Sequence, residues 1–279
     1  MRVLVIGADG MLGRAVQATA PARVELRPST VADLDITDAA GVDAALASRP
    51  DWVINCAAWT RVDDAEAHEA EATRINGEAV GIIGRTAARH GVRVLQISTD
   101  YVFDGMLGRP YREDDIPNPQ GAYGRSKLAG ERALAASGCR WTVVRTQWLY
   151  GGGPSFARTM WRKGREGAQA RVVDDQFGAP THVSELAQVI WRLVGKRAQG
   201  IWHAAAGGYT NWYEVARLVY GAVGADPALV TPCTTAEFGA RAPRPAYGRL
   251  DTSKLGGMRP YDAVLTEALH PDRCGVLGP

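Results

Sequence analysis

The chain begins with MRVLVIGADGMLG, residues 1–13, in which a short apolar run leads directly into a group of glycines. A continuous aliphatic run of this length is typical of a parallel strand that is buried on both faces. Gly7, Gly10 and Gly13 follow at intervals of three, and residues 14–20 have the composition of a helix. The segment therefore predicts a strand, a tight turn and a helix, which together form the repeating unit of an α/β fold.

Each glycine of the turn has its own physical reason. Gly7 permits the tight turn, Gly10 lets the backbone approach a pyrophosphate, and Gly13 allows the helix to pack closely on the strand. The free N–H groups at the helix start, together with the positive end of its dipole, attract phosphate. Glycine turns also occur for packing alone, but a strand before the turn and a helix after it are the context of a dinucleotide site.

Strands and helices are predicted to alternate through the first half of the chain. The further strands are expected at residues 23–27, 52–55, 93–97 and 141–145, and the helices at residues 37–48 (with Thr37 as N-cap), 64–90 and 123–136. Strands joined by helices imply a parallel sheet with right-handed crossovers. The predicted fold class is α/β, with a Rossmann-type doubly wound parallel sheet.

The character of the sequence changes after Tyr150, where GGGP at residues 151–154 interrupts the alternation. We predict an NAD(P)-binding Rossmann domain over residues 1–150 and a smaller C-terminal lobe over residues 151–279 that mainly binds substrate. This lobe is expected to be discontinuous, with some of its segments returning to the Rossmann domain.

A second motif indicates chemistry. Tyr123 and Lys127 are four residues apart on a predicted helix, so their side chains project from one face. A phenol loses its proton near pH ~10, and a neighbouring ammonium lowers that value. Thr99 lies just past the carboxyl end of a predicted strand, where its hydroxyl would hold a substrate oxygen in line for proton transfer. Tyr-x-x-x-Lys also occurs by chance in exposed helices, but the three residues together predict carbonyl reduction or alcohol oxidation.

Composition excludes several other classes of protein. The chain has 279 residues, of which 46% are hydrophobic, and its net charge is +2 with both signs scattered, so a nucleic-acid partner is not expected. No apolar run reaches the ~18 residues that span a bilayer and no signal segment is recognisable, so we expect no membrane contact and a cytoplasmic location. The cysteines Cys56, Cys139, Cys233 and Cys274 lie far apart, which favours reduced thiols over disulfides or a zinc site.

The sequence resembles the extended short-chain dehydrogenase/reductases in its glycine turn, in STDYVFDG at residues 98–105 and in YGRSKLAGE at residues 123–131. More narrowly, it resembles the dTDP-4-dehydrorhamnose reductase family, and this similarity spans nearly the whole chain. The segments that carry the narrower match are WTRVDDAE at residues 59–66, RTQWLY at 145–150, DDQFGAPT at 174–181 and LDTSKL at 250–255.

The resemblance implies roles for the matching positions. Tyr123 would donate a proton to a 4-keto oxygen, Lys127 would lower the pKa of Tyr123 and hold the nicotinamide ribose, and Thr99 would hydrogen-bond the keto group. The implied cofactor contacts are Gly7, Gly10, Met11, Leu12, Gly13, Asp35, Ile36, Ala57, Ala58 and Thr60. The expected substrate contacts are Thr99, Asp100, Val102, Phe103, Trp148 and Phe156, with Trp148 as a flat apolar wall.

The end of the second predicted strand bears on the choice of cofactor. An acidic residue there favours NADH by binding the ribose 2′-hydroxyl, whereas an arginine suits the 2′-phosphate of NADPH. This chain has Arg27 and Ser29 at that point and no acidic residue beside them. The predicted cofactor is therefore NADPH with Arg27 at its phosphate, and NADH is the alternative.

The second half of the chain offers candidates for a nucleotide-sugar ligand. Phe156 could stack on a base, and Arg241, Arg244 and Arg249 could bind a diphosphate through paired N–H donors. The alternative is that Phe156 belongs to the core and the arginines are solvated. Gln176 is expected to shape a binding loop.

The predicted function is NAD(P)H-dependent reduction of the 4-keto group of dTDP-4-dehydro-β-L-rhamnose to dTDP-β-L-rhamnose. One alternative is another dTDP-4-keto-6-deoxyhexose 4-ketoreductase, and a second is a non-catalytic dinucleotide-binding regulatory subunit, against which the retention of Thr99, Tyr123 and Lys127 speaks. Ala15 stands where the family resemblance implies an acidic residue, so no metal site and no magnesium-bridged dimer are predicted, and a homodimer of another kind is left open.

Overall fold

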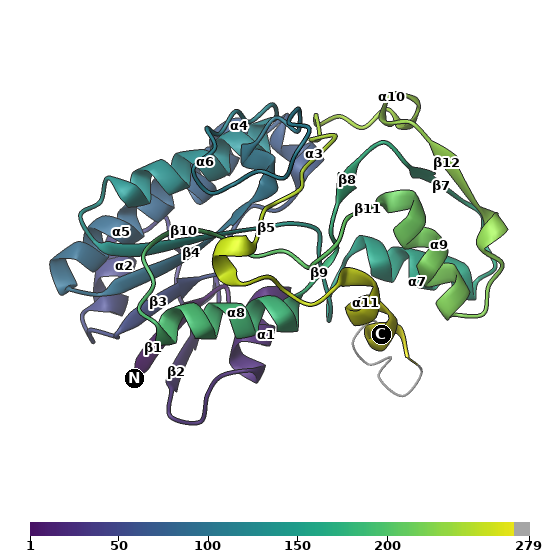
Figure 1. Cartoon of the computed structure of the whole chain (residues 1–279). Helices are drawn as coiled ribbons and strands as arrows, with labels where there is room; N and C mark the ends of the chain where they lie inside the picture. Colours follow the sequence, from purple (N-terminus) through teal and green to yellow (C-terminus); the bar gives the residue numbers. More distant parts are fainter. Residues whose placement is uncertain (271–279) are drawn as a thin grey trace.

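Six parallel strands form the central sheet of this protein, of which the computed structural model describes residues 1–270 (Figure 1). From one edge to the other the strands are β2 (Glu25–Ser29), β1 (Arg2–Ile6), β3 (Trp52–Asn55), β4 (Arg93–Thr99), β5 (Arg140–Thr146) and β10 (Gly200–His203). The chain moves to one side of β1 with β2 and to the other side with β3. In open parallel sheets, ligands bind at the carboxyl ends of the strands beside such a reversal.

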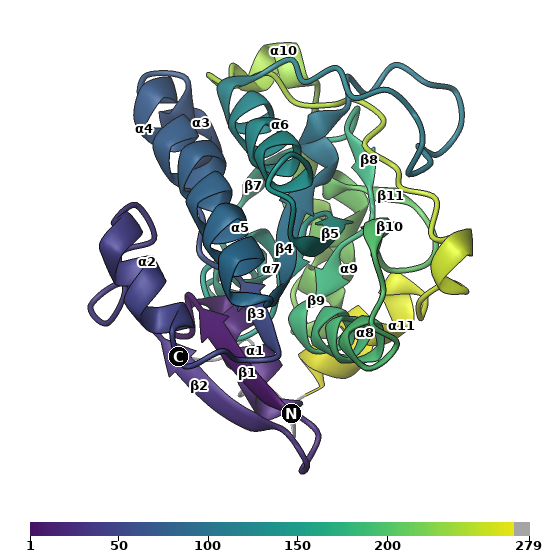
Figure 2. The ribbon, with the colours of Figure 1, turned by 90° about the vertical axis from the view of Figure 1, so that its left-hand side faces the viewer.

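Helices cover both faces of this sheet, because successive side chains of a strand point to opposite faces. Val3 and Val5 of β1 pack in one cluster with residues of α1 (Met11–Ala18) and α8 (Val183–Gly195). Leu4 and Ile6 of the same strand pack in a second cluster with residues of α2 (Ala39–Leu46), α5 (Ala79–His90) and α6 (Ala122–Ala135) (Figure 2). The apolar run at the start of the chain is thus buried on both sides, as predicted.

Several predicted boundaries differ from the structure. Strand β4 runs on to Thr99 rather than ending at residue 97, and α1 begins at Met11 rather than at residue 14. Strand β2 lies two residues later than expected, and α2 is capped by Asp38, which accepts a hydrogen bond from the Ala40 N–H, rather than by Thr37. The single helix expected over residues 64–90 is divided into four segments. These are α3 (Val62–Ala65), α4 (Glu69–Thr73), a π-helical turn (Arg74–Glu78) and α5.

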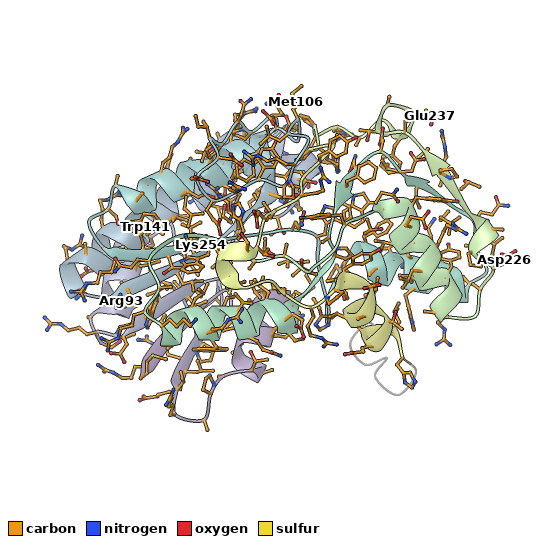
Figure 3. All side chains as sticks on the ribbon, viewed as in Figure 1. Arg93, Met106, Trp141, Asp226, Glu237 and Lys254 are labelled. Carbon is orange, nitrogen blue, oxygen red and sulfur yellow. The ribbon has the colours of Figure 1, made fainter. Side chains whose placement is uncertain are left out.

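A smaller lobe is built around α7 (Phe156–Arg165), α9 (Trp212–Ala222) and α11 (Tyr261–Leu269), whose apolar residues form one cluster. Its strands pair as β7 (Ala170–Val173) with β12 (Val230–Cys233), β6 (Leu149–Tyr150) with β9 (Thr181–His182), and β8 (Phe177–Gly178) with β11 (Thr210–Asn211). The remaining elements are α10 (Thr235–Phe238) and 3-10 turns at Asp100–Val102, Pro227–Leu229 and Ser253–Leu255. In Figure 3, Arg93 and Trp141 lie on the lobe with the large sheet, and Asp226 and Glu237 on the smaller lobe.

The second half of the chain contributes to both lobes. Strand β10 completes the large sheet beside β5, and α8 packs against α1, where the Trp191 indole N–H donates to the Val16 carbonyl oxygen at 2.9 Å. The division of function at residue 150 remains a prediction.

Cys56, Cys139 and Cys233 are free thiols, and Cys274 lies outside the described residues. Within residues 1–270, no helix combines the length and apolar character needed to span a bilayer.

Candidate active site

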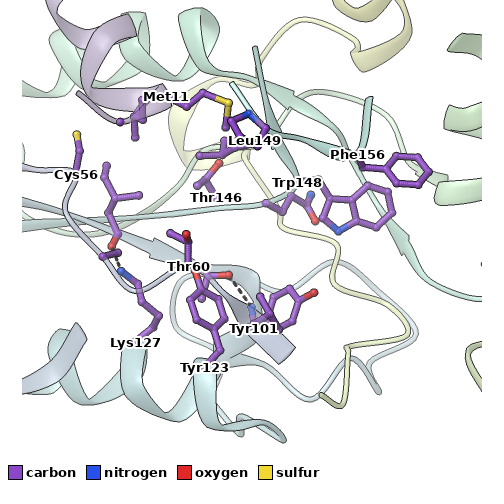
Figure 4. Close-up of a pocket in the computed structure, with 18 of the residues that line it drawn as sticks. Met11, Cys56, Thr60, Tyr101, Tyr123, Lys127, Thr146, Trp148, Leu149 and Phe156 are labelled. Carbon is purple, nitrogen blue, oxygen red and sulfur yellow. Dashed lines mark hydrogen bonds between the residues drawn. The ribbon is translucent and has the colours of Figure 1, made fainter. Parts of the chain in front are cut away.

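A cavity of about 1280 Å³ lies where the carboxyl edge of the large sheet faces the smaller lobe (Figure 4). Its lining comes from the ends of β1, β3 and β4, from the start of α6, and from α7, β7 and α9 of the smaller lobe. Pockets for a single small ligand commonly measure ~300–1000 Å³. The cavity is therefore large enough for two ligands, one on the sheet side and one on the lobe side.

The glycine turn forms the sheet side of this cavity. Gly7 has φ +73°, and a Cβ on it would lie 2.7 Å from the Ala57 backbone nitrogen at the end of β3. A Cβ on Gly13 would lie 2.1 Å from the Gly7 carbonyl oxygen, so α1 packs directly on the turn. Gly10 caps α1 without a side-chain hydrogen bond, which leaves the first N–H groups of the helix to a ligand. This cradle fits the pyrophosphate of a dinucleotide.

The predicted cofactor contacts share this side of the cavity. Those that line it are Gly7, Gly10, Met11, Leu12, Gly13, Asp35, Ile36, Ala57, Ala58, Thr60, Tyr123 and Lys127. The Asp35 carboxylate accepts hydrogen bonds from the N–H and the hydroxyl of Thr37 at 2.9 and 2.8 Å, and these hold the pKa of Asp35 below its usual value. Sequence reasoning missed Arg74, which lines the cavity close enough to Asp35 to lower its pKa further.

Arg27 is not brought to this site. Because β2 runs on to Ser29, Arg27 lies in the middle of the strand rather than at its end. Its guanidinium donates to the Ala45 carbonyl oxygen at 3.2 Å and to the Ser48 hydroxyl at 3.3 Å, and it does not line the cavity. The structure therefore does not support the predicted contact between Arg27 and a 2′-phosphate.

Thr99, Tyr123 and Lys127 come together in the cavity, from the end of β4 and the first turns of α6. Figure 4 shows Tyr123 and Lys127 on α6. Thr99 is the last residue of β4, its side chain 6% exposed, and its hydroxyl donates to the Asp100 carboxylate at 3.1 Å. The Lys127 ammonium is buried and donates to the Ile97 carbonyl oxygen at 2.7 Å, which fixes it against β4. The edge of the Tyr101 ring contacts the Tyr123 ring, with 5.5 Å between their centroids.

Burial dominates the acid–base properties of this group. It raises the pKa of Tyr123, the Asp100 carboxylate raises it further, and a hydrogen bond with Thr99 lowers it. The net shift of the Tyr123 pKa is upward, contrary to the predicted lowering, because burial and the Asp100 carboxylate outweigh the hydrogen bond with Thr99. Burial also raises the pKa of Asp100 to about 7 and lowers that of Lys127 to about 8. A phenol held in its protonated form suits a proton donor.

On the lobe side, two indole rings form a wall. Trp148 stacks on Trp212, with ring centroids 3.6 Å apart, and Phe156 contacts Trp212 at 4.6 Å. Trp148 has φ +48°, a left-handed backbone that is costly for a bulky residue and is typical of functional sites. Trp148, Phe156 and Asp100 all line the cavity, and their contact with substrate remains a prediction.

Val102 and Phe103 do not reach the cavity. The 3-10 turn at Asp100–Val102 directs both side chains inward, where they are 0% and 1% exposed. Phe103 stacks on Tyr111 with centroids 4.1 Å apart, within a cluster that includes Leu128. These two residues therefore belong to the core, and the structure corrects their assignment as substrate contacts.

Of the three arginines proposed for a diphosphate, only Arg244 lines the cavity. Its guanidinium donates to both oxygens of Asp63, at 2.7 and 3.1 Å. Arg249 instead lies over the rings of Tyr209 and Tyr247. Gln176 lines the cavity and donates to the Thr235 hydroxyl at 2.9 Å.

Two cations on the lobe side were missed. Lys163 of α7 and Arg171 of β7 both line the cavity. Phe156, Met160 and Lys163 also line it, at i, i+4 and i+7 of α7, so helical spacing was the signal that could have found Lys163. Among residues 1–270, no cluster of three or more His, Cys, Asp or Glu side chains is arranged to hold a metal ion.

A parallel sheet with a glycine turn after β1, and a Thr, Tyr and Lys group between β4 and α6, define an extended short-chain dehydrogenase/reductase. The sequence matches the family model described as "RmlD substrate binding domain" over residues 1–269. The chain belongs to this family, that of the dTDP-4-dehydrorhamnose reductases, as the sequence resemblance predicted.

Named relatives cover nearly the whole chain. It is 43% identical to a dTDP-4-dehydrorhamnose reductase of Streptomyces griseus, with 99% of this chain and 95% of the relative covered. It is 42% identical to a probable dTDP-4,6-dihydroxy-2-methyloxan-3-one 4-ketoreductase of Streptomyces antibioticus, with 98% and 95% covered. The crystal structure of a Bacillus anthracis dTDP-4-dehydrorhamnose reductase in complex with NADP superposes with a TM-score of 0.92, at 34% identity and with 95% and 97% covered.

Proposed function

We propose that this protein reduces the 4-keto group of dTDP-4-dehydro-β-L-rhamnose to give dTDP-β-L-rhamnose, with NADPH as the reductant. The observation that carries the proposal is the meeting of Thr99, Tyr123 and Lys127 in one cavity of about 1280 Å³, between a glycine cradle and an aromatic wall. The relative from Streptomyces griseus, covered over nearly its full length, bears the name of this activity.

Each residue of the group has a task in this reaction. The Tyr123 phenol, protonated because its pKa is raised, delivers a proton to the keto oxygen. The Thr99 hydroxyl holds that oxygen in place, and the Lys127 ammonium stabilises the phenolate that remains. The Trp148 indole offers a flat apolar surface to the sugar ring.

NADPH would lie along the glycine turn and, when bound, would supply the hydride that completes the reduction. The N–H groups at the start of α1 would hold its pyrophosphate. Arg27 does not line the cavity, so the arginine near Asp35 that could meet a 2′-phosphate is Arg74, whose guanidinium donates to both oxygens of the Glu71 carboxylate at 2.7 and 2.9 Å. The bound NADP in the Bacillus anthracis relative supports this choice of cofactor.

Another 4-ketoreductase of dTDP-linked deoxysugars is the second candidate. The relative from Streptomyces antibioticus, named for a different keto sugar, is almost as similar to this chain as the one from Streptomyces griseus, at 42% against 43% identity. The same proton donor would serve both substrates, so the choice of sugar depends on the wall of the cavity.

The cytoplasmic location stays a prediction from the sequence, and a homodimer stays open.

The test is an assay with the purified protein, NADPH and enzymatically prepared dTDP-4-dehydro-β-L-rhamnose, in which the nicotinamide absorbance is followed and the sugar product is identified. We expect oxidation of NADPH and formation of dTDP-β-L-rhamnose. Tyr123→Phe should lower kcat by roughly 100-fold or more while NADPH still binds, because a positioned general acid contributes about that much. No oxidation by the folded wild-type protein, or a different product, would refute the proposal.

A further inference from the structure

Gln147 is a buried polar side chain with unused hydrogen-bonding capacity. It lies between β5 and β6, its side chain is 2% exposed, and it lines the cavity. Neither the oxygen nor the nitrogen of its carboxamide has a hydrogen-bond partner within residues 1–270. Buried amides are nearly always paired, because an unpaired one loses its contacts with water and gains nothing in return. A group of this kind facing a cavity indicates that a ligand completes it.

The backbone fixes where this carboxamide lies. Trp148 has φ +48°, so Gln147 and Trp148 do not point to opposite sides as neighbours in a strand do. Both side chains instead lie against Gly178 of β8. A Cβ on Gly178 would be 2.9 Å from the Gln147 Oε1 atom and 2.7 Å from the Trp148 indole. The glycine thus makes room for an amide and an indole side by side on one wall.

This wall is held rigidly. Trp148 stacks on Trp212 of α9, and Thr146, the last residue of β5, is paired in register with Thr99 of β4. Figure 4 shows Thr146 and Trp148 on the opposite side of the cavity from Tyr123 and Lys127. A sugar whose keto oxygen meets Tyr123 and whose ring lies on Trp148 therefore presents its remaining substituents to the wall beside Gln147.

We propose that Gln147 is a specificity-determining residue whose carboxamide binds ring hydroxyls of the keto sugar, so that the site prefers a hydroxylated sugar to a deoxygenated one. The inference rests on the proposed function and deepens it. A carboxamide carries an acceptor and two N–H donors, which match two adjacent hydroxyl groups. A deoxygenated sugar would leave these buried atoms unpaired, and sites built to bind a hydroxyl discriminate strongly against the analogue that lacks it.

The test compares dTDP-4-dehydro-β-L-rhamnose with its 2-deoxy analogue in wild type and Gln147→Met, which keeps the length of the side chain and removes its polar atoms. We expect wild type to prefer the hydroxylated sugar. In Gln147→Met, kcat/KM for that sugar should fall roughly 10–100-fold, mainly through KM, while kcat/KM for the 2-deoxy sugar changes by less than about 3-fold. The dissociation constant of NADPH, measured by fluorescence titration, should stay within about 2-fold.

Gln176→Met is the matched control, because Gln176 lines the same cavity and is also buried, at 5% exposed, but its amide already donates to the Thr235 hydroxyl. The control should leave the ratio between the two sugars unchanged. Equal losses on both sugars in Gln147→Met, no loss on either, or weaker NADPH binding would overturn the role of Gln147. If Gln147→Met does not fold, Gln147→Asn, which withdraws the amide by one methylene, should shift the ratio in the same direction. Failure of wild type to reduce either sugar would instead refute the proposed function.

Discussion

At the scale of single residues, burial sets the protonation states on which the proposed chemistry depends. The Lys127 ammonium lies in a dry environment that lowers its pKa to about 8, although the nearby Glu131 carboxylate acts in the opposite direction. Burial also raises the pKa of the Tyr123 phenol. Around neutral pH the phenol therefore carries its proton while Lys127 is still mostly charged. That combination is the one needed for proton donation followed by stabilisation of a phenolate.

The depressed pKa of Lys127 predicts a loss of activity in mild alkali. A lysine is charged below its pKa, so raising the pH through about 8 removes the ammonium and should lower kcat/KM for the keto sugar. Lys127→Met should be slow at all pH values and should lack this alkaline decline. The measurement is kcat/KM between pH 6 and 10.

Lys254→Met is the control for that profile. Lys254 is an exposed lysine over the Trp202 ring and does not line the cavity, so its loss should leave the alkaline decline in place. A decline that persists unchanged in Lys127→Met would assign it to another group.

At the scale of elements, the sequence predicts a strand or helix well where an apolar run marks it. It does not predict an interruption that depends on a buried polar side chain. Strand β3 matches its predicted bounds, because it is an apolar run that is buried along its whole length. The helix predicted over residues 64–90 is interrupted by the π-helical turn, where Asn76 is buried. Its partners come from a loop and from α6, which helical periodicity does not reveal. The bounds of β2 were misplaced for another reason: most of its residues are exposed, so no apolar run marks where the strand ends, and Arg27 was placed at that end.

Asn76 is predicted to stabilise this region through three hydrogen bonds. Its side chain donates to the Trp59 carbonyl oxygen and the Ser126 hydroxyl, both at 3.0 Å, and accepts from the Trp59 N–H at 2.9 Å. Asn76→Ala should lower the free energy of unfolding by about 1–3 kcal/mol, because partly buried backbone groups lose their partner. Denaturant unfolding followed by circular dichroism measures this change.

The matched control for Asn76 is Asn118→Ala. Asn118 is exposed and makes one side-chain bond, from its amide to the Asp104 carboxylate at 3.1 Å. Its replacement should change the free energy of unfolding by less than about 0.5 kcal/mol. Similar values for the two variants would show that the contacts of Asn76 add little to stability.

At the scale of the whole molecule, polar contacts join separate elements around the cavity. Glu131 of α6 and Arg145 of β5 form a buried ion pair at 2.7 Å beneath the site, and the Ser98 hydroxyl, next to Thr99, donates to the same carboxylate. Arg244 reaches Asp63 across 181 positions. The sequence suggested Arg244 as a ligand for a diphosphate. Its pairing with Asp63 could not be predicted, because the neighbours of a residue in sequence do not reveal its partner in space. The glycine turn and the Tyr-x-x-x-Lys motif are local, and the structure brings both to the cavity.

The Arg244–Asp63 pair is predicted to hold the segment that follows α10 over the mouth of the cavity. Arg244 is mostly buried, lines the cavity and makes a paired contact with the Asp63 carboxylate, whose pKa it lowers, so the pair stays charged at neutral pH. Arg244→Gln should raise KM for the dTDP-sugar by roughly 3–30-fold, with a smaller effect on kcat, because the segment loses its attachment while the proton donor stays in place.

Asp63→Asn should act in the same direction, and the double variant should be little worse than either single one, since both changes remove the same contact. Arg259→Gln, which breaks the ion pairs of Arg259 with Glu185 of α8 and Glu267 of α11 and does not touch the cavity lining, is the control and should leave KM unchanged. Strictly additive effects of Arg244→Gln and Asp63→Asn would show that the two residues act separately and that the pair does not close the cavity.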